Sequence, residues 1–105
     1  MLKSKMEVAY DLKALLMVVI QDLQGRKETI PDSLKNFYEL CDSVAGKHHY
    51  DNNTFNEYFN ICRIDLSKLA DGGFLHFDND AEKHKFFNDI DTLKRIYKSF
   101  VFDVM

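Results

Sequence analysis

Apolar side chains recur along this chain at steps of three and four residues, the spacing that gathers them on one face of a helix. Four segments carry such a stripe, over residues 4–23, 31–45, 54–70 and 80–102. The clearest stripe lies in the second segment and consists of Leu34, Phe37, Tyr38, Cys41, Val44 and Ala45. The pattern therefore predicts four helices.

The first segment contains the apolar run "ALLMVVI" at residues 14–20. A strand is the alternative there, because Val18, Val19 and Ile20 are β-branched. The helical spacing continues on both sides of the run, which favours a helix. Since apolar residues surround this helix for about two turns, we expect it to be the central one, covered on several sides.

Several residues indicate where the helices begin and end. Pro31 suits the first position of a helix, where its missing amide proton costs nothing. Gly25 suits the end of the first helix, and Gly46 can take the left-handed conformation that closes the second. The sequence "TFNE", from Thr54 to Glu57, is a capping box, in which each of these two side chains accepts a hydrogen bond from the other residue's amide. It predicts a helix start at Thr54.

The chain between the third and fourth segments is less regular. The apolar stretch "FLHF" at residues 74–77 is expected as a short extended segment over the core, after which Asp78, Asn79 or Asp80 can cap the last helix. Two alternatives remain open. The third helix can break at residues 65–67, and the tail "SFVFDVM" alternates enough to form a terminal strand.

A chain of 105 residues has the length of one domain, and we expect a single helical domain over residues 1–105. Each of the four stripes must be buried against another element. Antiparallel helices joined by short loops bury them with local connections. The expected fold is therefore an all-α four-helix bundle.

The formal net charge is −3, and no part of the chain is basic enough to grip a phosphate backbone, so direct binding to nucleic acid is not expected. Residues 64–91 hold seven acids and three lysines. The apolar run at 14–20 is far shorter than the about 20 residues of a membrane-spanning helix. Glu7 and Asp11 fit an export leader poorly. We expect a cytoplasmic protein without membrane partners, in which Cys41 and Cys62 are buried thiols.

Histidines and acids gather at two places, which raises the question of a metal site. His48 and His49 are adjacent, so one ion could bind both only in an unusual loop conformation and with ligands from elsewhere. Asp80 and His84 are four residues apart and can share a helix face. We expect no cofactor, no metal and no catalytic residues. A metal-dependent enzyme that uses these four residues as ligands is one alternative.

The aromatic residues exceed what a bundle interior can hold, since adjacent Phe86 and Phe87 cannot both face one core. Exposed aromatics ringed by acids are typical of protein-binding faces. We therefore expect a small acidic module that neutralises a partner protein with a basic surface, such as a toxin or nuclease, in the manner of a toxin-immunity protein, an antitoxin or a phage-encoded inhibitor. The expected partner-binding residues are Asp78, Asp80, Glu82, Phe86, Asp89 and Tyr58.

Two other options concern the partner. A helical regulatory or nucleic-acid-associated protein is the second alternative, for which Lys94, Arg95 and Lys98 form the only basic cluster on the last segment. The extra aromatic side chains also allow self-association as a homodimer.

Overall fold

The computed structural model describes the chain apart from a few short stretches. The described residues are 4–46, 51–72, 75 and 77–104, with side chains as far as Ser99. The helices are α1 (Lys5–Gly25), α2 (Asp32–Ala45), α3 (Asn52–Asp71) and α4 (Asp80–Val104). All regular secondary structure in this part of the chain is helical, which confirms the all-α prediction.

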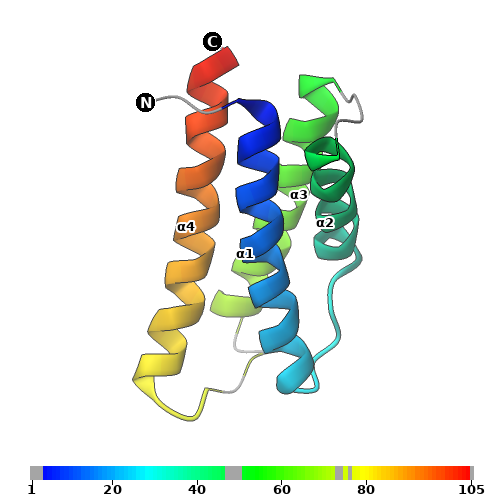
Figure 1. Cartoon of the computed structure of the whole chain (residues 1–105). Helices are drawn as coiled ribbons and strands as arrows, with labels where there is room; N and C mark the ends of the chain where they lie inside the picture. The colour runs from blue at the N-terminus through cyan, green and yellow to red at the C-terminus, as the bar shows by residue number, and fades with distance from the viewer. Residues whose placement is uncertain (1–3, 47–50, 73–74, 76, 105) are drawn as a thin grey trace.

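The helices form a closed ring of neighbours. α1 packs against α2 and α4, and α3 packs against the same two helices. Figure 1 shows that consecutive helices are antiparallel and that α1 begins at the end of the bundle where α4 finishes. The fold is a four-helix bundle with up-down-up-down order. Because α3 is unbroken and α4 reaches Val104, a break at 65–67 and a terminal strand are both wrong.

α1 is less enclosed than its apolar run predicts. Leu16 and Val19 are buried against the bundle, but Val18 is 41% exposed and Tyr10 is 65% exposed. The expectation of a helix covered on several sides is therefore wrong. The reason is the ring arrangement, in which every helix keeps an outward face, and α1 presents Val18 and Tyr10 on that face.

Polar side chains cap the helices, although not always at the predicted residue. The Asp51 carboxylate accepts a hydrogen bond from the Thr54 amide at 2.6 Å, so α3 begins at Asn52. The predicted start at Thr54 is wrong by two residues, and Thr54 is not the cap. An aspartate cap satisfies the same free amides and also places negative charge at the positive end of the helix dipole.

The start of α4 resolves an alternative that the sequence left open. Among the three candidate residues, Asn79 caps the helix, because its Oδ1 accepts a hydrogen bond from the Glu82 amide at 2.9 Å.

Pro31 precedes α2 as its cap residue, one position earlier than predicted, and its carbonyl accepts hydrogen bonds from the amides of Leu34 and Lys35.

The predicted role of glycine at helix ends is also corrected. Gly46 closes α2 at φ −84°, outside the left-handed region. At the end of α1, Gly25 is the last helical residue, and the left-handed position falls on Lys27 at φ 60°. The Glu28 amide donates to the Leu23 carbonyl at 3.0 Å, which is the hydrogen bond of a Schellman motif.

An aromatic cluster holds α2, α3 and α4 together. The Phe59 ring stacks on Tyr97 with centroids 3.9 Å apart, and Phe37 meets Phe55 and Phe59 edge-on at 5.7 and 5.9 Å. The Tyr97 hydroxyl donates to Asn56 Oδ1 at 2.6 Å, so this largely buried polar group is satisfied.

The segment before α4 covers the end of the core. Leu75 is buried, and the half-buried Phe77 lies 5.9 Å from the Phe86 ring. Phe74 and His76 belong to the predicted extended segment at 74–77 but lie outside the described residues.

Candidate functional site

The acids at the start of α4 are held by contacts within the chain. Glu82 Oε2 accepts the Asp78 amide at 3.2 Å and pairs with Arg26 at 3.3 Å. Arg26 also pairs with Asp22 at 3.1 Å, and its guanidinium lies 4.8 Å from the centroid of the Phe77 ring. Glu82 therefore ties the end of α1 to the start of α4, while the side chain of Asp78 lies exposed beside it.

The other predicted residues of α4 differ in exposure. Asp80 is exposed. Asp89 is half-buried, 4.0 Å from Lys85, and burial raises the pKa of its carboxyl, with Lys85 opposing the rise and Asp22 adding to it. Phe86 is 2% exposed and belongs to the core, so it presents no surface to a partner.

Tyr58 lies apart from these acids. It is 38% exposed on α3, and its neighbour Phe59 stacks on Tyr97, which is 17 residues along α4 from Asp80. The structure thus brings Asp78, Asp80 and Glu82 together at one end of the bundle and places Tyr58 toward the other end. The six predicted residues do not form one surface.

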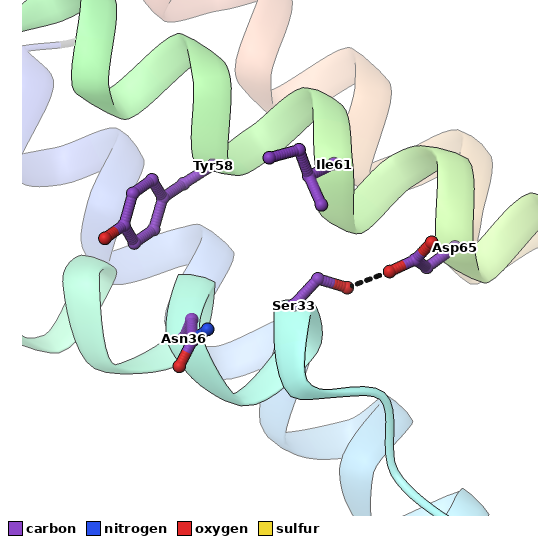
Figure 2. A pocket seen from close by; sticks show the side chains of 5 residues that line it. All are labelled: Ser33, Asn36, Tyr58, Ile61 and Asp65. Carbon is purple, nitrogen blue, oxygen red and sulfur yellow. Dashed lines mark hydrogen bonds between the residues drawn. The ribbon is translucent and has the colours of Figure 1, made fainter.

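A cavity of about 290 Å³ lies beside Tyr58, between α2 and α3. Figure 2 shows Tyr58 and Ile61 on α3 facing Asn36 and Ser33 on α2. The Ser33 hydroxyl donates to Asp65 Oδ2 at 2.6 Å and closes one end of the opening. Ile61 is 47% exposed, so the α3 side of the cavity presents an apolar surface next to Asp65, and the α2 side is polar.

A second cavity of about 290 Å³ shares Asn36 and Tyr58 with the first. We name these two adjoining cavities together the α2–α3 groove. It is lined by Ser33, Asn36, Glu39, Leu40, Ser43, Tyr58, Ile61 and Asp65. Tyr58 stands where the two cavities meet.

The groove follows from the side chains on one flank of α2. Ser33, Asn36 and Ser43 recur at steps of three and seven, so they share the flank that faces α3. Their side chains are too short to fill the space beside Tyr58 and Ile61. The two helices therefore touch through their buried stripes and leave the outer edge of the contact open.

Negative charge prevails in the groove. Asp65 and Glu39 line it, and no lysine or arginine is among the described residues of either cavity. Burial, with a contribution from Asp65, raises the pKa of the nearby Cys62 thiol to about 12, and burial also raises the pKa of Cys41. Both cysteines are buried free thiols, as predicted, and protonated thiols of this kind are poor nucleophiles.

The residues of the enzymatic alternative are only partly described. His48 and His49 lie outside the described residues, while Asp80 and His84 are exposed on the first turns of α4. Where the structure describes the chain, it holds no group of three histidine, cysteine, aspartate or glutamate side chains that could bind a metal ion.

The basic residues of the regulatory alternative lie along the second half of α4. Lys94 is 4.0 Å from Asp91, the Arg95 guanidinium donates to Thr92 at 2.9 Å, and Lys98 is exposed.

None of the helices in the described residues has the length and apolar character needed to cross a membrane.

Sequence reasoning identified Tyr58 but missed the groove around it. A sequence signal for the groove was present in Ile61 and Ile64, which fall outside the apolar stripe of α3 and are both exposed.

Comparison with protein-family models, curated proteins and solved structures finds no match to this chain.

Proposed function

We propose that this chain is a small protein-binding module of the cytoplasm that neutralises a partner with a basic surface, in the manner of a toxin-immunity protein, an antitoxin or a phage-encoded inhibitor. The observation that carries the proposal is the α2–α3 groove, where exposed Tyr58 and Ile61 stand beside Asp65 and Glu39. Aromatic and aliphatic side chains supply affinity, and the charges beside them select the partner.

The acids at the start of α4 add support for a basic partner. Asp78 and Asp80 are exposed, and charges of one sign raise the rate at which an oppositely charged protein approaches. A rigid bundle is a suitable frame for such a surface, because it holds the contact residues in place before binding.

The outer face of α1 is the competing surface. Tyr10 lines a cavity of about 340 Å³ with Met6, Glu7 and Asp11. We favour the α2–α3 groove because it joins two cavities around one exposed aromatic residue and carries polar groups along most of its α2 wall. Each surface carries one exposed tyrosine, Tyr58 or Tyr10, so the two can be compared directly.

The experiment replaces one tyrosine at a time with the photoreactive residue p-benzoylphenylalanine in the native host. Tyr58 is the test position, and Tyr10 is the control, because both are exposed tyrosines on different helices. Irradiation should join the Tyr58 position, and not the Tyr10 position, to one discrete protein. That protein, once purified, should be inhibited by the chain in its own activity.

The affinity of the captured protein gives a second readout. Tyr58→Ala should weaken binding by about tenfold or more, as expected for a central aromatic contact, and Tyr10→Ala should leave it unchanged. Cross-linking only at Tyr10, or at neither position, would overturn the proposal. So would a captured protein whose activity is the same with and without the chain.

A further inference from the structure

The length of the α2–α3 groove limits what can lie in it. Its α2 wall runs from Ser33 to Ser43, which is ten residues or about 15 Å at the rise of an α-helix. That length matches about three turns of a partner helix. A single side chain would fill only one of the two cavities.

The walls favour a helix over an extended strand as the occupant. Both walls are α-helices, whose own backbone groups are already paired along their length. An extended segment would find no free sheet edge here and would leave its backbone amides and carbonyls unpaired. A helix satisfies its own backbone and needs only side-chain contacts, as in other helix-in-groove complexes.

The apolar contact lies near the middle of the groove. Tyr58 belongs to both cavities, and Ile61 is one turn further along α3. Because both side chains are more than a third exposed, an apolar side chain of the partner can cover them and remove them from water.

The acids are spaced along the groove. Asp65 is fixed at the level of Ser33 by their 2.6 Å hydrogen bond, and Glu39 lies six residues further along α2, or about 9 Å. Residues i and i+7 of a helix share one face and are about 10.5 Å apart. Two basic residues seven apart therefore match the two acids.

We propose that the α2–α3 groove binds a partner helix with lysine or arginine at two positions seven residues apart and an apolar residue between them. This inference rests on the proposed function, since it names the partner segment that the same surface recognises. The cations pair with Asp65 and Glu39, and the apolar residue covers Tyr58 and Ile61.

A library of helical peptides of about 12 residues, the length of the groove plus half a turn, tests this with the full chain as bait. Peptides displayed on phage are selected on the wild-type chain after depletion on Asn36→Leu, whose larger apolar side chain narrows the groove at a residue that lines both cavities. Asn36 is exposed, so the variant should keep its fold, which circular dichroism and thermal unfolding verify.

The selected peptides should carry the basic pair at the seven-residue spacing. At low salt, a representative peptide should bind the double variant Asp65→Asn, Glu39→Gln about tenfold more weakly, because two charge pairs are lost. The control is Asp91→Asn, which removes an exposed acid of α4 and should leave binding unchanged.

Three results would overturn the inference: no enrichment over Asn36→Leu, enriched peptides without the basic pair, or equal affinity for the double variant. Failure here is distinguishable from failure of the proposed function. A partner that cross-links at Tyr58 through a segment without basic residues refutes only the helix assignment, whereas the absence of any Tyr58 cross-link in the host refutes the function even if peptides bind.

Discussion

Two residues at the end of α1 do not suit the backbone conformation that they adopt, and replacing them should change the stability of the protein. Lys27 occupies a left-handed conformation at φ 60°, where a Cβ atom is unfavourable. Gly25 is helical, and a Cβ added there would meet nothing within 4 Å. The changes Lys27→Gly and Gly25→Ala should therefore both stabilise the protein.

The magnitudes follow from the two backbones. Lys27→Gly relieves about 1–2 kcal/mol of left-handed strain but gives the unfolded chain extra freedom worth about 0.5–1 kcal/mol. The net gain is about 0.5–1 kcal/mol. Gly25→Ala removes the entropic cost of a helical glycine and gains a similar about 0.5–1 kcal/mol. The double variant should melt about 4–10 °C higher.

Urea and thermal unfolding followed by circular dichroism measure these changes. The control is Lys27→Ala, which removes the lysine side chain but keeps the Cβ atom, and it should change stability little. If Lys27→Ala stabilises as much as Lys27→Gly, the lysine side chain and not the backbone is the cause. A loss of stability in Lys27→Gly would refute the left-handed assignment, and a loss in Gly25→Ala would refute open space at that position.

Three further outcomes are expected. Burial raises the pKa of Tyr97 to about 12, and the phenol of the unfolded chain ionises at about pH 10. The free energy of unfolding of the wild-type chain should therefore fall as the pH rises from about 10 toward 12. Urea titrations should show a smaller fall for Tyr97→Phe, and an equal fall would contradict this. Cys41 and Cys62 should react with iodoacetamide only in urea, as mass spectrometry would show, and rapid labelling of the native chain would disprove their burial. Asp80→Lys should slow association with the partner identified by cross-linking several-fold at low salt, as stopped-flow measurements would show. An association rate equal to that of the wild-type chain would show that Asp80 does not help to attract the partner.

The four helices could be predicted because the apolar periodicity extends over many residues in each segment. In α2, Leu34, Phe37, Cys41 and Val44 of the predicted stripe are buried, and Tyr38 is half-buried against the core. Such a pattern reports an average over several turns, so a single atypical residue does not change it. The interior of each helix is therefore the most predictable part of this fold.

The helix ends could not be predicted as well, because each depends on one or two residues, and residues close by in the sequence can serve as the cap equally well. Asp51 and Thr54 are both good caps, and the structure uses Asp51. Gly25 is the residue best suited to a left-handed turn, yet α1 continues through Gly25 and the left-handed turn falls on Lys27.

The candidate site was the least predictable feature. Phe86 and Phe87 are equivalent in the sequence, and the rotation of α4 in the bundle decides that Phe86 enters the core. The groove needs the relative placement of Asn36 and Tyr58, which lie on separate helices. Short polar residues on α2 look like an ordinary solvent face until α3 is set beside them.

The distance between the acidic start of α4 and the groove separates their roles in binding. Tyr97, which contacts the residue next to Tyr58, is 17 residues from Asp80, or about 25 Å along α4. Charges at that distance are largely screened at physiological salt, where the Debye length is about 8 Å. Asp80 can therefore act on approach at low salt but not on contacts at Tyr58. Under the proposed function, the effect of Asp80→Lys should vanish at physiological salt, whereas Tyr58→Ala should weaken binding at every salt concentration.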